Sequence, residues 1–168
     1  MTKSAIPTRR SGKIEEAIIR LLTKRRQTLA LAESCTGGGI AHRLTNVPGA
    51  SAVFLGGMVV YSNAAKQKFL GVRAKMLARH GAVSEAVARA MAEGTRGKFG
   101  ADFAIAVTGI AGPTGGTKVK PVGTVFIALA GASETDVKRK FNPCGREQFK
   151  DLTAQQALGM LWARLVCD

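Results

Sequence analysis

The sequence predicts an α/β protein whose mixed sheet is covered by helices on both faces. Short apolar runs alternate with segments in which apolar residues recur every three or four positions, which is the strand and helix order of such folds. The last two strand-like runs are joined by a short connection and not by a helix. Strands joined in this way pair antiparallel, so the sheet is expected to be mixed.

The first three elements follow from apolar spacing and one glycine run. Residues 13–27 form a helix, residues 28–32 form a short buried strand, and residues 35–45 form a helix that opens at a glycine-rich turn. The apolar face of the first helix consists of Ile14, Ala17, Ile18, Leu21 and Leu22.

The middle of the chain adds a strand and three helices. Residues 54–62 read as the second strand. Residues 64–71 and 74–81 are predicted to form two helices, which end at Gly71 and Gly81, because glycine is a typical helix stop. Ser84 is a favoured N-cap for the helix over 85–100, and Glu85 lies in the first turn, where the helix dipole favours an acid.

Three strands and a long helix complete the chain. Residues 102–109 and 124–131 are strongly apolar strands. Residues 136–142 alternate and carry basic outward positions, which is typical of an edge strand. The closing helix, 146–166, offers Phe149, Leu152, Leu158, Leu161, Trp162 and Leu165 to the core.

Length and composition fit one globular domain. The chain has 168 residues, of which 46% are apolar and 21% charged. We expect residues 1–12 to form a flexible tail and residues 13–168 to form a single domain. No apolar run approaches the ~18 residues of a membrane helix, and no secretory pattern begins the chain, so a cytoplasmic location without membrane contact is expected.

The cysteines and histidines do not form a metal-binding pattern. There are three cysteines and no Cys-x-x-Cys pair, which argues against a disulfide framework and a structural zinc site. His42 and His80 have no ligands at motif spacing and are interpreted as helix-surface or helix-end residues. We expect neither a metal nor another cofactor.

The net charge of +14 indicates an affinity for anions, either nucleic acid or a small phosphorylated substrate. The basic residues are spread along the chain, the aromatic residues do not interleave with them, and no nucleic-acid motif is present. A nucleic-acid partner is therefore disfavoured, and a solvated basic surface is the preferred interpretation.

Polar side chains gather where three expected strands end. Because ligands bind at the carboxyl ends of strands in open α/β sheets, these groups are expected to face one crevice if the strands are parallel. The groups are Glu33, Ser34, Cys35 and Thr36 after the first strand; Tyr61, Ser62, Asn63 and Lys66 after the second; and Thr108 with the loop 109–117 after the third.

Ser34 is the favoured nucleophile of this crevice. It lies on a strand–turn–helix like that of a nucleophile elbow, and the glycines 37–39 let a ligand approach the backbone. Lys66 can serve as its base if burial lowers the pKa of the amine. Two alternatives stay open: Ser34 or Thr36 caps the helix, or Cys35 is the nucleophile, although it is expected to point into the core.

The loop "GIAGPTGGT" resembles a phosphate-binding loop in composition only. It matches neither the P-loop nor the dinucleotide-binding pattern, so a nucleoside triphosphate or dinucleotide is not indicated. Its small residues favour close approach of a ligand, while a plain surface connection is the alternative.

Several motifs resemble those of the CinA C-terminal domain family, the nicotinamide-nucleotide amidohydrolases. The motifs are "AESCTGG", "VPGASAVFLGGMVVYSNAAK", "GAVSE", "VTGIAGPTGGT" and "KPVGTVFIALAG", in one order from about Leu29 to the closing helix. The resemblance implies a three-layer α/β/α sandwich around a mixed, mostly parallel sheet of about five strands. It also implies the stand-alone form of the family, since the chain is too short for the extra N-terminal domain of the long form.

The resemblance implies hydrolysis of the carboxamide of nicotinamide mononucleotide to nicotinate mononucleotide and ammonia without a metal. Ser34 matches the family's serine and Lys66 its lysine, and Tyr61 and Thr108 match further active-site positions. Arg146 matches the first arginine of a pair, whereas Lys150 stands at the second position. The implied substrate-binding residues are Thr36, Gly37, Gly38, Asn63, Gly109, Ala111, Gly112, Gly115, Gly116 and Arg146.

The expected chemistry is acyl transfer, with the oxyanion on N–H groups at the start of the helix after Ser34. Two alternatives are an amidase for a different pyridine nucleotide and a non-enzymatic protein associated with nucleic acid. A homo-oligomer is the default expectation for such enzymes.

Overall fold

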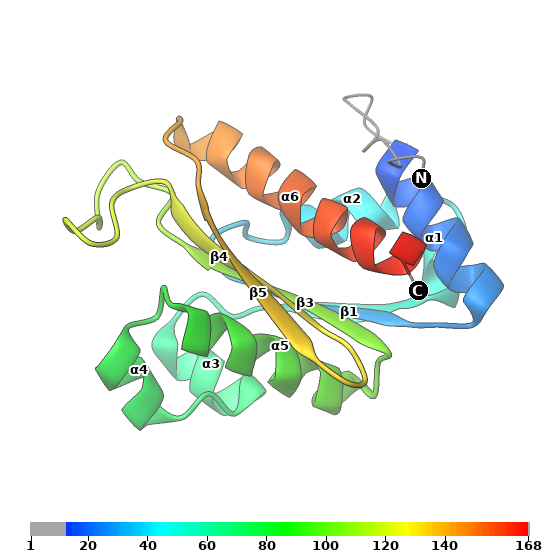
Figure 1. Cartoon of the computed structure of the whole chain (residues 1–168), viewed down its shortest axis with the longest axis horizontal. Helices are drawn as coiled ribbons and strands as arrows, with labels where there is room; N and C mark the ends of the chain where they lie inside the picture. Colours follow the sequence, from blue (N-terminus) through cyan, green and yellow to red (C-terminus); the bar gives the residue numbers. More distant parts are fainter. Residues whose placement is uncertain (1–12, 168) are drawn as a thin grey trace.

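The computed structural model describes residues 13–167, and these form a five-stranded sheet between two layers of helices. The predicted tail, residues 1–12, lies outside the described residues. Figure 1 shows α1, α2 and α6 on one face of the sheet and α3, α4 and α5 on the other. The elements are α1 (Lys13–Arg25), β1 (Leu29–Glu33), α2 (Gly39–Thr45), the 3-10 turn η1 (Ala50–Ala52), β2 (Phe54–Val59), α3 (Asn63–Leu70), α4 (Ala74–His80), α5 (Glu85–Phe99), β3 (Phe103–Gly109), β4 (Thr124–Ala130), β5 (Thr135–Phe141) and α6 (Arg146–Cys167).

The sheet is mixed, as predicted, and its strand order is β2-β1-β3-β4-β5. β1 pairs parallel with β2 and β3, whereas β4 pairs antiparallel with both β3 and β5. Four strands therefore run in one direction, and only β4 is reversed. The antiparallel β3–β4 pair was not predicted; it follows from a connection that contains no helix and so returns the chain beside β3.

Each face of the sheet packs against its own core. The side chains of Leu29, Leu31 and Ile105 pack with α1, α2 and α6, and those of Ala32, Ala104 and Ala106 pack with α3, α4 and α5. This alternation is the two-residue period of a strand, and burial on both faces explains the continuously apolar runs. In α6, Phe149, Leu158, Leu161 and Leu165 are buried as expected; Trp162 is half-buried and Leu152 is exposed.

β5 is an edge strand, as predicted, and its last four residues are exposed. Ser84 caps α5 by accepting a hydrogen bond from the Val87 N–H, as predicted. His42 lies on the surface of α2 and His80 ends α4, which confirms their interpretation. Among residues 13–167, no helix is long and apolar enough to span a bilayer.

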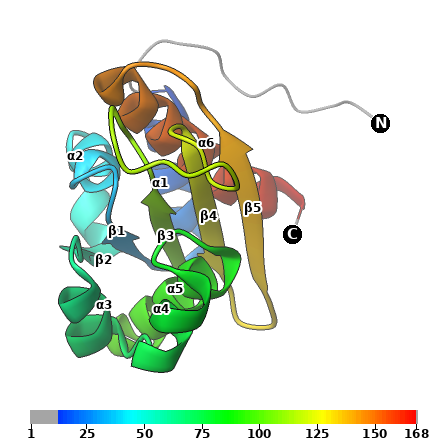
Figure 2. The same ribbon diagram turned by 90° about the vertical axis from the view of Figure 1, so that its left-hand side faces the viewer.

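The connections at the carboxyl ends of β1, β2 and β3 lie at one end of the molecule. Figure 2 shows this end facing the viewer, with α2 and the start of α6 in the upper part and the yellow-green loop between β3 and β4 in front of the sheet. The predicted site residues belong to these connections, to the last two residues of β3 and to the first turns of α3 and α6.

Candidate active site

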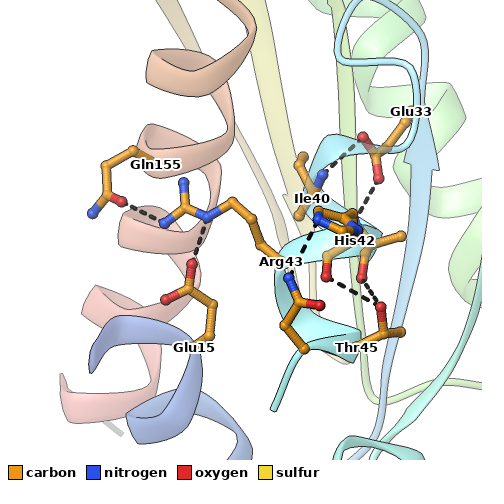
Figure 3. Close-up of polar contacts among 9 residues, drawn as sticks. Glu15, Glu33, Ile40, His42, Arg43, Thr45 and Gln155 are labelled. Atoms are coloured by element: carbon orange, nitrogen blue, oxygen red, sulfur yellow. Dashed lines mark hydrogen bonds and ion pairs between the residues drawn. The ribbon is translucent and has the colours of Figure 1, made fainter. Parts of the chain in front are cut away.

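Glu33, the last residue of β1, organises the turn that carries Ser34. Its buried carboxylate accepts hydrogen bonds from the Thr36 hydroxyl (2.6 Å) and from the backbone N–H groups of Gly38 (3.0 Å), Ile40 (3.1 Å) and Ala41 (2.8 Å). Figure 3 shows the carboxylate of Glu33 pointing at the first turn of α2. Glu33 therefore takes the capping role for α2.

This arrangement corrects one expectation. Neither Ser34 nor Thr36 caps α2, because the N-cap position is Gly38 and the capping acceptor is Glu33. Three N–H groups of the helix start are already bonded to the carboxylate. These three donors are therefore engaged by Glu33. The oxyanion site expected at the start of the segment after Ser34 stays a prediction that other N–H groups of the turn would have to meet.

Ser34 and Lys66 meet in the interior. The Lys66 Nζ donates to the Ser34 Oγ at 3.1 Å, and 32 residues of sequence separate them. The side chain of Ser34 is buried, and Lys66 is 1% exposed. β1 and β2 are parallel neighbours, so the segments that follow them emerge side by side and bring the two residues together.

The Lys66 amine is held by the chain just before its own helix. Nζ also donates to the Val60 carbonyl at 2.8 Å and to the Tyr61 carbonyl at 3.2 Å. Burial lowers the pKa of Lys66 below its usual 10.5, because the charged ammonium loses its water. A lysine with a lowered pKa and a serine hydroxyl within hydrogen-bond distance is the arrangement that general-base activation requires.

Cys35 packs into the core between the sheet and the α1, α2 and α6 layer, as predicted for it. It is 5% exposed, and burial raises the pKa of its thiol from 9.0 to about 12. A thiol with so high a pKa stays protonated near neutrality and is a weak nucleophile. The geometry and the ionisation of the side chain both favour Ser34 over Cys35.

Arg146, the first residue of α6, bridges two of the other predicted groups. Its guanidinium donates to the Gly112 carbonyl at 2.8 Å and to the Tyr61 hydroxyl at 2.8 Å. Lys150 lies one turn further along α6, and its Nζ is 3.7 Å from the position that a Cβ on Gly37 would occupy. Two cations of α6 therefore reach the two loops beside Ser34 and Lys66.

For the remaining predicted residues Thr108, Asn63 and Thr36, the structure gives no hydrogen bond to Ser34 or Lys66 among the described residues. The buried Thr108 hydroxyl donates to the Ala82 carbonyl at 2.9 Å, so its proton is engaged with the α4–α5 connection. Asn63 is the exposed first residue of α3, and the Thr36 hydroxyl is bonded to Glu33.

Close packing within the β3–β4 loop requires glycine at several of its positions. A Cβ on Gly109, Gly112 or Gly116 would lie 2.9, 2.4 or 2.6 Å from atoms of the segment 122–125. Ala111 and Gly112 are buried and Gly115 is exposed. Close packing of the loop on its own return strand thus explains these glycines without a ligand.

Sequence reasoning placed Glu33 at a strand end but gave it no role. The available signal was an acid directly before a glycine-rich helix start, since a carboxylate there satisfies free N–H groups. No sequence signal could have identified the carbonyls of Val60 and Tyr61 as acceptors for Lys66, because every residue type supplies a backbone oxygen.

The fold and the pair define a class: α/β proteins of three layers that join a serine and a buried lysine at the carboxyl ends of parallel strands. Within that class the chain belongs to the CinA C-terminal domain family, whose model matches residues 11–165. The predicted resemblance is confirmed.

Relatives and solved structures agree with this assignment. A CinA-like protein of Pseudothermotoga lettingae is 50% identical over 148 residues, and one of Geotalea daltonii is 54% identical over 154 residues. These alignments cover 88% and 91% of this chain but only 36% and 37% of the relatives, so the chain spans about a third of their length.

Among solved structures, a CinA superfamily protein from Klebsiella pneumoniae has a TM-score of 0.91 at 34% identity, with 95% of this chain and 100% of that chain covered. The competence/damage inducible protein CihA from Agrobacterium tumefaciens has a TM-score of 0.84 at 42% identity, with 96% and 98% covered.

Proposed function

We propose that this protein hydrolyses the carboxamide of nicotinamide mononucleotide to nicotinate mononucleotide and ammonia, with Ser34 as nucleophile and Lys66 as general base. The observation that carries the proposal is the buried contact of 3.1 Å between the Lys66 Nζ and the Ser34 Oγ. The choice of substrate rests on the family resemblance, since the relatives are named only as CinA-like or competence-damage proteins.

In the proposed first half-reaction, the neutral Lys66 amine accepts the Ser34 hydroxyl proton as Oγ attacks the amide carbon. The C–N bond then breaks, and Lys66 returns the proton to the leaving nitrogen, which departs as ammonia. In the second half-reaction, water attacks the Ser34 ester, Lys66 again accepts and returns a proton, and the nicotinate mononucleotide leaves.

Lys66 suits both transfers because its environment favours the neutral amine. The carbonyls of Val60 and Tyr61 hold the Lys66 nitrogen beside Ser34, so the amine does not have to change its orientation before the proton is transferred. When Lys66 is neutral, its lone pair accepts the Ser34 O–H, and the remaining two N–H bonds match the two carbonyls.

The ribose phosphate is assigned to Arg146, Lys150 and the loop around Gly112. Arg146 offers a planar set of donors that suits a phosphate, whereas Lys150 offers a point charge. Both cations lie on α6, and the first is already linked through Tyr61 to the segment that holds Lys66.

The direct test is to incubate the purified protein with nicotinamide mononucleotide and to measure ammonia and nicotinate mononucleotide together. Nicotinamide riboside and the dinucleotide serve as competing substrates, and the Ser34→Ala variant serves as the blank. Stoichiometric release of both products by the wild type alone supports the proposal. Release from another pyridine nucleotide but not from the mononucleotide would replace the substrate while keeping the chemistry.

A further inference from the structure

A shallow basic region lies between the β3–β4 loop and the end of β5, and its lining includes no residue of the candidate active site. It is a groove of about 480 Å³ lined by Lys118, Val119, Pro121, Arg139, Lys140 and Phe141. None of these residues was assigned to the amidase chemistry. Figure 2 shows the yellow-green loop in front of β4 and near β5, and residues of the loop and of β5 line the groove.

The apolar part of the groove is unusually exposed for side chains of its kind. Val119 is 74% exposed and Phe141 is 56% exposed. They come from segments about 20 residues apart in sequence, so only the fold brings them to one groove. An exposed aromatic ring beside a second apolar side chain offers a stacking and packing surface for a flat ring.

The cations of the groove have no acidic partner among residues 13–167. Lys118 and Lys140 are exposed and make no ion pair there. The acids nearest in sequence, Glu134 and Asp136, pair with Arg164 instead. Positive charge therefore accumulates at this end of β5.

Arg139 adds an ordered cation to the wall of the groove. Its guanidinium lies 5.9 Å from the centre of the Phe126 ring and donates to the Val119 carbonyl at 2.9 Å. The bond to Val119 joins the loop to β5, and the Lys120 Nζ joins the loop to α4 by donating to the His80 carbonyl at 2.7 Å. The loop wall of the groove is thus fixed in place by its bonds to β5 and α4, which favours a preformed site, as ligand sites usually are.

We propose that this groove binds one nucleotide, with the base against Phe141 and Val119 and the phosphates on Lys118 and Lys140. The ligand must carry an aromatic ring and several negative charges, because the groove offers one exposed ring beside uncompensated cations. The volume suits one small molecule. A single-stranded polynucleotide is disfavoured because only one exposed aromatic ring lines the groove.

The test is isothermal titration calorimetry of the full chain with adenosine triphosphate. Adenosine and inorganic tripolyphosphate, which represent the two halves of this ligand, are titrated separately. The triphosphate is expected to bind once per chain and each half much more weakly. Phe141→Leu keeps apolar bulk but loses the ring face, and it is expected to weaken binding about 5-fold or more. The double variant Lys118→Ala, Lys140→Ala is expected to weaken it about tenfold or more.

The matched control is Arg20→Ala, Lys24→Ala on the exposed face of α1, which removes the same charge far from the groove. An equal loss in this control would show that only the overall field attracts the nucleotide and would overturn the site. Arg146→Ala is expected to leave binding unchanged, and a loss there would place the nucleotide in the candidate active site.

Two further results would overturn the proposal: binding of an oligothymidylate of about 12 nucleotides, or of phosphatidylglycerol vesicles, without binding of the triphosphate. Because release of ammonia from nicotinamide mononucleotide is measured separately, a failure here leaves the proposed amidase function standing.

Discussion

Lys66 is buried with three acceptors around its amine, and in the proposed mechanism this residue is the base for Ser34. Lys66→Arg keeps a positive charge but cannot accept a proton near neutrality, so we expect it to lose turnover nearly as fully as Lys66→Ala, by roughly 10²- to 10⁴-fold. Steady-state turnover of the two variants decides the matter. Substantial activity in Lys66→Arg would make the residue an anchor for the phosphate and would end the general-base mechanism.

Single substitutions to alanine test which of the two neighbouring residues, Ser34 or Cys35, is the nucleophile. Ser34→Ala is expected to reduce kcat by roughly 10³-fold or more while substrate binding and the fold persist. Cys35→Ala is expected to keep most of its turnover and to lose only some stability, because the thiol is buried and protonated. The measurements are ammonia release and thermal unfolding, and the reverse pattern would transfer the role to Cys35.

The pH dependence follows from the direction of the Lys66 shift. Burial lowers the pKa of this amine below 10.5, and only the neutral amine accepts a proton. The value of kcat/KM is therefore expected to rise with pH through the folded-state pKa of Lys66 and to level above it. Lys66→Ala, whose residual rate is measured at high enzyme concentration, is expected to lack this rise; a rise that persists in that variant would assign the titration to another group.

At the scale of elements, the α2 turn depends on Glu33 and the helix body depends on Arg43. Arg43 donates to Glu15 of α1 (2.5 Å) and to Gln155 of α6 (2.6 Å), so three helices meet at one guanidinium, as Figure 3 shows. Ser34 is therefore carried by a turn fixed on both sides, by a carboxylate from the sheet and by two neighbouring helices.

Glu33→Gln tests whether the turn positions the nucleophile. The amide retains one acceptor oxygen but presents N–H groups where a carboxylate oxygen accepted a hydrogen bond. We expect the free energy of unfolding to fall by about 2 kcal/mol and kcat to fall while KM changes little. Urea unfolding and steady-state kinetics measure both effects, and an unchanged kcat beside a reduced stability would restrict Glu33 to a structural role.

Sequence patterns predicted the elements well because burial on both faces leaves uninterrupted apolar strands, and because Ser84 and Gly71 mark helix ends by local chemistry. They missed the reversal of β3 to β4, which depends on the path of a loop without periodicity. The site was predicted to the level of Ser34 and Lys66. The carboxylate cap by Glu33 and the carbonyls around Lys66 required the fold, because they are tertiary contacts of groups with no distinctive spacing.

At the scale of the whole molecule, the net charge is +14. Only the cations close to the phosphate of the proposed amidase substrate are expected to affect its binding. Arg146→Ala is expected to raise KM for nicotinamide mononucleotide about tenfold and to affect the unphosphorylated riboside far less. Arg20→Ala should change neither, because exposed charges beyond ~10 Å are screened at ordinary salt. Equal losses for both substrates would remove Arg146 from the phosphate site.

A homo-oligomer remains a prediction for this chain. The β2 edge of the sheet carries Leu55 and Val59, which are 44% and 55% exposed, and β2 contains no charged residue to discourage pairing. Sedimentation equilibrium is expected to give a mass above 17.6 kDa, and Val59→Lys is expected to lower it. A monomeric wild type would contradict this expectation.

The two duties of the proposed enzyme come from separate stretches of the chain. The turn, the nucleophile and the base all lie within residues 33–66, whereas the loop and the cations that face the phosphate lie within residues 109–150. Tyr61 links the two by accepting a hydrogen bond from Arg146, and Lys150 lies beside Gly37. Substitutions at the cations Arg146 and Lys150 are therefore expected to change which substrates the proposed enzyme accepts while Ser34 and Lys66 stay in place.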